Sequence, residues 1–85
     1  HELNKPHPNP FNRSTTISFS LSSFSHVTIK AYDLKGNLVE TLSQNYYHSG
    51  SHQINWDGSD YPSGLYIIRM DADNFKSTQM ITLLK

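Results

Sequence analysis

Histidine and serine are the residues of this chain that could carry acid–base or nucleophilic chemistry. The chain has five histidines, which are His1, His7, His26, His48 and His52. None stands in the spacing H-E-x-x-H that binds a catalytic metal, and no serine lies in a G-x-S-x-G turn that would expose a nucleophile. Because a catalytic site needs a nucleophile, a base and an orienting group close together, the sequence predicts no catalytic residues and no enzyme activity.

Cysteine is absent from the chain. Thiolates bind zinc in many structural sites, act as nucleophiles in many hydrolases and form disulfide scaffolds in pairs. All three kinds of cysteine chemistry are therefore excluded, and we expect no cofactor and no bound metal. The stability of the fold must come from the packing of its side chains.

Carboxylate and amide oxygens gather in two turn-like stretches, where they could bind calcium. The residues concerned are Asp57, Asp60, Asp71, Asp73 and Asn74. Calcium prefers oxygen ligands, but the spacing of these residues matches no EF-hand loop. Because Asp and Asn also hydrogen-bond to their own backbone in turns, turn chemistry explains the same residues without a metal. A calcium site stays an alternative.

Tyrosine rings on the surface of a β-sandwich could stack on sugars, as flat rings do in carbohydrate-binding modules. Tyr46, Tyr47 and Tyr61 are the tyrosines expected to lie in loops, where such a platform would form. Scattered exposed aromatic side chains are, however, ordinary on protein surfaces. A carbohydrate-binding accessory module of a secreted glycosidase therefore stays an alternative function.

The length and the charge of the chain limit its partners. Its 85 residues suffice for one hydrophobic core, so we expect one domain. Seven Lys and Arg balance seven Asp and Glu, which leaves no net charge to attract a nucleic acid. No apolar run approaches the ~20 residues of a membrane helix. We therefore expect neither nucleic-acid binding nor a transmembrane segment.

The elements that would position these side chains are β-strands. Apolar residues alternate with polar ones in several short windows, and no stretch follows a helical period for three turns. Residues 15–21 alternate three apolar side chains with serine or threonine, and residues 26–33 repeat the alternation. Each of these two windows therefore predicts a half-buried strand.

A turn follows the second strand at Asp33-Leu34-Lys35-Gly36. Aspartate can accept hydrogen bonds from the backbone that follows it, and glycine takes the positive φ that other residues resist. Residues 37–42 return as a third strand, so residues 26–42 predict a hairpin. The polar stretch 43–50 is then expected to be a connection.

The second half of the chain is divided by turns in the same way. The next strand ends at Trp56, which we expect to be buried. Two glycines, a proline and two aspartates make residues 57–64 a double turn. The nearly continuous apolar run 65–70 predicts a central strand covered on both faces. A hairpin turn over residues 71–74 then leads into the closing strand 75–84.

Six or seven short strands at spacings of about ten residues are typical of a two-sheet β-sandwich. The sequence therefore predicts an all-β antiparallel sandwich over residues 15–85. An extended, proline-rich lead-in over residues 1–14 precedes it. The side chains expected in the core are Ile17, Phe19, Val27, Ile29, Val39, Ile54 and Trp56.

Several segments of the chain form an ordered series. They are Pro8-Asn9-Pro10-Phe11-Asn12, Ser14 to Ile17, Val27 to Val39, Gly50 to Gly58, Ser63 to Tyr66 and Met80 to Lys85. In its order and spacing, the series resembles the type A C-terminal sorting domain of the type IX (Por) secretion system of Bacteroidetes and related bacteria. The resemblance extends over nearly the whole chain.

The resemblance implies an immunoglobulin-like sandwich of about seven strands at the C-terminus of a larger cargo protein. The cargo, fused N-terminal to the domain, would pass through the periplasm to the cell surface or the medium. The implied partners are the outer-membrane translocon, its shuttle protein and a sortase-like surface protease that removes the domain, which we expect to be monomeric. The residues expected to be recognised are Pro8, Asn9, Pro10, Phe11, Asp33, Gly36, Gly58, Gly64, Tyr66, Leu83, Leu84 and Lys85.

A related pattern occurs in the immunoglobulin-like domain of flagellar hook-capping proteins. It consists of an apolar strand, D-x-x-G-x-x-V, W-D-G and G-x-Y. The lead-in Pro8 to Asn12 and the ending Leu83-Leu84-Lys85 favour the sorting domain over this relative. A purely structural immunoglobulin-like spacer is a further alternative, and it predicts that changes in the exposed turns leave the location of the protein untouched.

Overall fold

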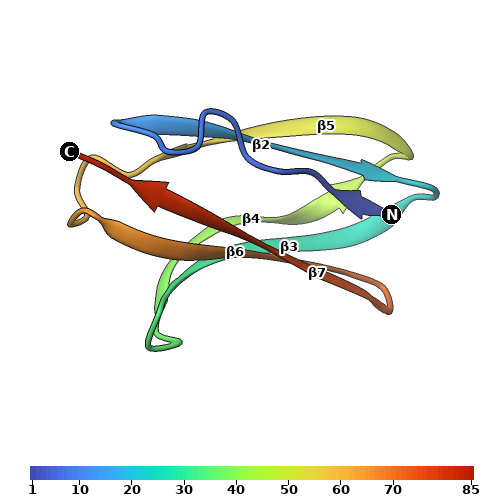
Figure 1. Ribbon diagram of the computed structural model, residues 1–85. Helices are drawn as coiled ribbons and strands as arrows, with labels where there is room; N and C mark the ends of the chain where they lie inside the picture. The colour runs from blue at the N-terminus through green and yellow to red at the C-terminus, as the bar shows by residue number, and fades with distance from the viewer.

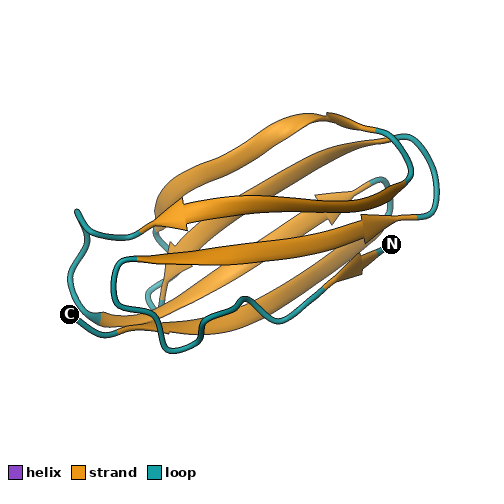
Figure 2. Ribbon diagram, turned by 90° about the horizontal axis from the view of Figure 1, so that it is seen from above, coloured by secondary structure: helices purple, strands orange, loops and turns teal.

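Seven β-strands and no helix make up the computed structural model, which describes residues 1–85, so no helix is present that could cross a membrane. The strands are β1 (Glu2–Leu3), β2 (Ser14–Leu21), β3 (Ser25–Asp33), β4 (Leu38–Tyr47), β5 (Gly50–Asp57), β6 (Gly64–Ala72) and β7 (Phe75–Leu83). One sheet has the order β1-β2-β5 and the other the order β4-β3-β6-β7, with all neighbours antiparallel. The two sheets face each other as the layers of a sandwich (Figures 1 and 2). The predicted all-β, immunoglobulin-like fold is confirmed.

The core lies between the two sheets, because alternation along each strand sends every second side chain inward. In β2 and β3 the buried residues alternate from Thr15 to Leu21 and from Ser25 to Ala31. Among the side chains expected in the core, the fully buried ones are Ile17, Phe19, Val27, Ile29 and Trp56. Val39 and Ile54 pack against the core but are only half-buried, since β4 and β5 are edge strands of their sheets.

The hairpin of β3 and β4 is longer than the sequence predicts. Residues 43–47 continue β4 and pair with the first half of β3, so the expected connection over residues 43–50 is wrong. Only His48 and Ser49 lie between β4 and β5. The polar composition of residues 43–47 does not indicate a strand, because β4 is an edge strand of its sheet with many solvent-facing side chains. Two register shifts against β3 also interrupt its alternation.

Strand β6 lies between two neighbours in its sheet, but only one of its faces is covered. On the other face Leu65 is 39 % exposed and Ile67 is half-buried. The prediction of cover on both faces is therefore wrong, because the outer face of a two-layer sandwich meets water. The hairpin from β6 into β7 is confirmed, and its turn is reduced to Asp73 and Asn74.

The lead-in over residues 1–14 packs along the sandwich. Its short strand β1 pairs with β2, and the side chains of Leu3, Pro6 and Phe11 are buried. The first and last residues lie at opposite ends of the domain (Figure 1). A segment that precedes residue 1 would therefore leave from the end opposite to Lys85, beside the start of β7. A division of the chain into two parts at residue 14 stays a prediction.

Candidate recognition site

Residues 8–11, called the strap below, run parallel to the end of β7. The N–H of Phe11 donates to the Thr82 carbonyl at 2.9 Å, and the N–H of Leu84 donates to the Phe11 carbonyl at 2.8 Å. The Asn9 side chain adds two bonds: its Oδ1 accepts the Thr82 N–H at 3.0 Å, and its Nδ2 donates to another β7 carbonyl at 3.3 Å. These bonds join distant parts of the chain and cover an edge of β7 that would otherwise be unpaired.

The ring of Phe11, a residue of the strap, packs directly against Gly58. Phe11 is 2 % exposed, and its ring centroid lies 5.5 Å from that of Trp56. A Cβ atom at Gly58 would stand 3.0 Å from Cε2 of Phe11 and 3.3 Å from Cδ2 of Leu83. The glycine of the W-D-G sequence is therefore needed for close packing between the strap, the end of β7 and the turn after β5.

Tyr66 fixes the loop that leads from β5 into β6. Its buried ring lies edge-on to Trp56, with 5.4 Å between centroids, and its hydroxyl donates to the Pro62 carbonyl at 2.6 Å. A tyrosine near the start of such a strand that bonds a few residues upstream is the tyrosine corner of immunoglobulin-like sandwiches. Burial, followed by the nearby charge of Asp33, raises the pKa of Tyr66, so its hydroxyl stays protonated and able to donate to a higher pH than that of a free tyrosine.

Tyr61 connects the same loop to strand β4. Its hydroxyl donates to Oε1 of Glu40 at 2.6 Å, and Nε1–H of Trp56 donates to the same oxygen at 3.4 Å. The hydrogen bond to Glu40, followed by burial, raises the pKa of Tyr61 to about 12. Glu40 therefore joins the edge strand β4 to the loop between β5 and β6, and it accepts hydrogen bonds from the polar atoms of both Tyr61 and Trp56.

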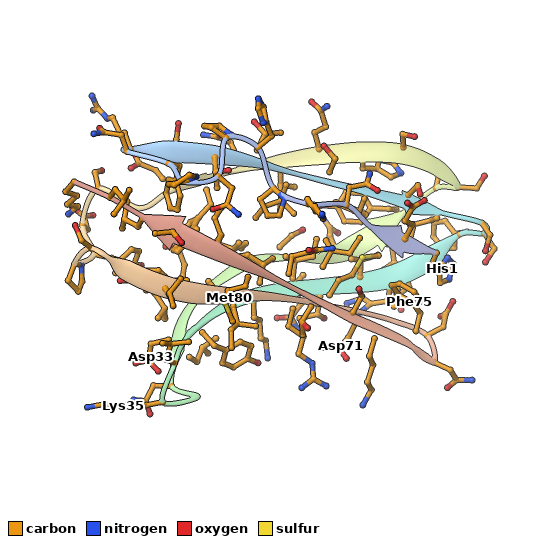
Figure 3. All side chains as sticks on the ribbon, in the orientation of Figure 1. His1, Asp33, Lys35, Asp71, Phe75 and Met80 are labelled. Atoms are coloured by element: carbon orange, nitrogen blue, oxygen red, sulfur yellow. The ribbon has the colours of Figure 1, made fainter.

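The turn between β3 and β4 is organised by Asp33. Its Oδ1 accepts the N–H groups of Lys35 and Asn37, both at 2.9 Å, and its carbonyl accepts the N–H of Gly36 at 3.1 Å. Gly36 has a φ of 86°, a value that favours glycine. The backbone hydrogen bond from Asn37 is the main cause that lowers the pKa of Asp33. Figure 3 shows this turn projecting from the sheet.

The last two residues are held against the loop before β6. The Lys85 N–H donates to Oγ of Ser63 at 3.0 Å, and its Nζ donates to the Ser59 carbonyl. Leu84 is 54 % exposed although the residue before it is fully buried. The chain end is thus fixed by polar contacts while the apolar side chain of Leu84 meets solvent.

Most residues expected to be recognised lie at one end of the sandwich, where the bridge between Phe11 and Leu83 and the register of β6 bring their segments together. Four of them are buried, namely Phe11, Gly58, Tyr66 and Leu83. Asp33 is half-buried, and the exposed ones are Pro8, Asn9, Pro10, Gly36, Gly64, Leu84 and Lys85. A partner cannot touch the buried four while the domain is folded. These four hold the exposed residues in position.

The other sites considered from the sequence are not assembled. Tyr46 and Tyr47 lie in β4, so their expected position in a loop is wrong. Tyr47 packs against Phe19 at 5.1 Å between centroids, whereas Tyr46 is 63 % exposed and stacks on Phe24. These two tyrosines and Tyr61 form no common platform. No group of three His, Cys, Asp or Glu side chains is arranged to hold a metal ion.

Sequence reasoning missed the residues that accept hydrogen bonds at this end. Glu40 lies in no motif, Ser63 is only the first residue of the segment Ser63 to Tyr66, and Pro62 is predicted only as part of a turn. The role of Glu40 depends on the fold bringing β4 against a loop some twenty residues further along, so no local signal reveals it. The corner of Tyr66 did have a signal, which is the G-x-Y sequence at the start of an apolar strand.

Two antiparallel sheets, a buried tryptophan and a tyrosine corner define the class of immunoglobulin-like β-sandwich domains. Within this class, the family described as secretion system C-terminal sorting domain matches residues 5–83. The chain belongs to this family. No curated protein and no solved structure matches the chain.

Membership of the family assigns the function of the domain. It is a C-terminal sorting signal for type IX secretion. Such a signal implies a cargo fused N-terminal to it, which is exported to the cell surface or the extracellular space. The matched range includes the strap, the Asp33 turn and the tyrosine corner. The hook-capping, spacer and carbohydrate-binding alternatives are not favoured.

Proposed function

We propose that the outer-membrane translocon of the type IX system and its shuttle protein bind the domain at its signature end, defined as residues 8–11, 58–66 and 83–85, with the Asp33 turn beside it. The domain acts by being recognised and has no catalysis of its own. A sortase-like protease at the cell surface then removes it from the cargo. The observation that carries the proposal is that hydrogen bonds join the strap, the loop and the chain end into one surface.

The order of this surface supports recognition by a preformed partner site. The strap is bonded to β7, and the loop is bonded at Pro62 by Tyr66 and through Tyr61 to β4. A surface that is already ordered loses little conformational freedom when a partner binds it. Exposed Leu84 and Lys85 then offer one apolar and one charged contact next to each other.

The chemistry of the signature end supports a role without catalysis. Its hydroxyl and carboxylate groups are used within the fold, as in the bonds from Tyr61 to Glu40 and from Tyr66 to Pro62. No serine, histidine and carboxylate meet there in the order that activates a nucleophile. In the strap and at the chain end, the exposed side chains that make no hydrogen bond within the fold are the apolar ones of Pro8, Pro10 and Leu84.

Export of a reporter tests the proposal. Residues 1–85 are fused behind a fluorescent reporter that is delivered to the periplasm of a type IX-competent host, and the fraction of reporter in the medium and on the surface is measured. We expect export of the full fusion and retention of a fusion that lacks residues 80–85. Retention of the full fusion in the periplasm, with the domain folded by circular dichroism, would overturn the proposal.

A pair of asparagine variants separates the signature end from the rest of the surface. Asn9→Ala removes two hydrogen bonds between the strap and β7, whereas Asn74→Ala changes an exposed asparagine in the turn between β6 and β7, at the opposite end. We expect the first variant to lower export and the second to export as the parent does, with both domains folded. Equal export by both variants would argue against the strap as a contact surface.

A further inference from the structure

The outer face of the four-stranded sheet carries apolar side chains across all four strands. Tyr32 on β3 stands opposite Leu38 on β4 and Ile67 on β6, and Ile67 stands opposite Met80 on β7. Leu38 and Met80 are 52 % and 54 % exposed. Solvent-facing positions of an antiparallel sheet are usually polar, so these four side chains, called the outer row below, form an apolar surface that the fold does not cover.

A groove of about 260 Å³ opens at the outer row. It is lined by Tyr32, Gly36, Ile67, Arg69 and Thr78. Pockets for drug-sized ligands have about 300–1,000 Å³, so this smaller groove suits a single side chain of a partner. Gly36 belongs to the projecting Asp33 turn, which connects the groove to a segment of the family signature.

The neighbouring cross-strand positions are cationic. Lys30 on β3 stands opposite Arg69 on β6. The Arg69 guanidinium is held by Asp71, with Nε to Oδ2 at 3.1 Å and Nη2 to Oδ1 at 3.2 Å, which fixes its plane beside the groove. Lys30 has no carboxylate within ion-pair distance. Figure 3 shows Asp71 on the side of this sheet that faces away from the three-stranded sheet.

We infer that the outer row is a second docking surface for a protein of the export machinery, whose segment inserts an aromatic side chain into the groove and sets a carboxylate against Lys30. An aromatic ring fits because it can pack on Ile67 and Tyr32 and stack on the fixed guanidinium of Arg69. A carboxylate complements the unpaired ammonium of Lys30. The inference rests on the proposed function and gives the domain a second contact surface, which adjoins the signature end at the Asp33 turn.

The charges on the outer face of the four-stranded sheet favour a protein segment as the partner over a second copy of this chain or a lipid surface. A second copy bound about a two-fold axis would bring the same surface against itself, and the nearby Asp71 carboxylate that could meet Lys30 of the other copy is already bonded to Arg69. An anionic lipid surface attracts proteins through an extended basic field, whereas this chain has equal numbers of acidic and basic residues. A protein segment with one aromatic ring and a nearby carboxylate matches both the groove and the unpaired ammonium of Lys30, which lies opposite Arg69 at the groove.

Site-specific photo-crosslinking tests the inference in the reporter fusion. Benzoyl-phenylalanine replaces Met80 in the outer row or, as a control, the exposed Gln53 on β5 of the other sheet. We expect the Met80 probe to form an adduct with an envelope protein of the host, on a peptide that contains an aromatic residue near a carboxylate. Lys30→Glu should lower the adduct yield about tenfold through charge repulsion, and Lys5→Glu, the same charge change on the exposed lead-in, should not.

Reversal of charge on the partner completes the test. Changing the identified carboxylate of the partner to lysine should restore the adduct with Lys30→Glu. Thermal unfolding checks that each variant is folded, and Lys30→Gln replaces Lys30→Glu if the latter is unstable. An adduct with lipid or with a second copy, equal adducts from both probe positions, or a folded Lys30 variant with unchanged yield would overturn the inference.

The two proposals fail in distinguishable ways. If the reporter is exported but the Met80 probe forms no protein adduct, the docking surface is wrong and the sorting function at the signature end stands. If the folded parent fusion is not exported, the proposed function fails and the inference that rests on it fails too. Export together with a charge-dependent adduct at Met80 supports both.

Discussion

Replacing Gly58 by alanine tests the packing that joins the strap to the turn after β5. Gly58 has no positive φ, so alanine is compatible with its backbone, but the new Cβ would lie 3.0 Å and 3.2 Å from two ring atoms of Phe11. Overpacking of this kind costs about 1–3 kcal/mol. Alanine also lowers the conformational entropy of the unfolded chain, which offsets about 0.4–1 kcal/mol of this cost. We expect a net loss of about 1 kcal/mol, or roughly 4–8 °C in Tm.

Urea unfolding followed by the fluorescence of Trp56, the single tryptophan, measures this loss. The loss should shrink when Gly58→Ala is made together with Phe11→Leu, because the smaller side chain leaves room for the new methyl group. Gly36→Ala is the matched control: nothing lies within 4 Å of its Cβ position, but φ is +86°. Its cost should come from backbone strain and stay the same beside Phe11→Leu. An equal cost of Gly58→Ala in both backgrounds would refute the packing argument.

Two further predictions concern groups whose titration the fold perturbs. The pKa of Tyr61 is raised to about 12, above its unfolded value of ~10. The contribution of Tyr61 to stability is therefore complete below pH ~10 and is lost as the pH rises toward 12. In urea titrations, Tyr61→Phe should remove this alkaline loss, and an unchanged profile would contradict the bond to Glu40. The pKa of Asp33 is lowered, so its contribution is present above its unfolded pKa of 3.8 and is lost as the pH falls through the folded value. Asp33→Asn should flatten the acid side of the stability profile, and a profile as steep as that of the parent would contradict this assignment.

The strands that the sequence predicts correctly are those in which local pattern and tertiary position agree. In β2 and β3, the apolar residues from Ile17 to Leu21 and from Val27 to Ala31 face the core and alternate with polar residues that face away, so a period of two is enough to find these strands. Gly36 and the Asp33 side chain likewise act within a few residues of sequence. Because their causes are local, the turn and its hairpin could be predicted without knowledge of the fold.

The features that sequence reasoning missed or misread depend on contacts across the fold. The second half of β4 is polar and is a strand only because β3 lies beside it. Two of the outward side chains of β6, those of Leu65 and Ile67, are apolar, so the run 65–70 resembles in composition a strand covered on both faces although one face is open. Glu40 meets Tyr61 through tertiary packing alone. Such contacts between distant segments cannot be predicted from the local pattern of residue types.

The family signature contains two kinds of residue, and stability measurements distinguish them. Phe11 is buried, so Phe11→Leu can affect export only by destabilising the domain or shifting the strap, whereas Lys85 is exposed and can contact a partner directly. Loss of a buried methylene costs about 0.8 kcal/mol or more, so Phe11→Leu should lower Tm and export together. Lys85→Ala should lower export at nearly unchanged Tm. If Lys85→Ala is exported normally while Phe11→Leu is fully stable and retained, the assignment of contact residues within the signature end is wrong.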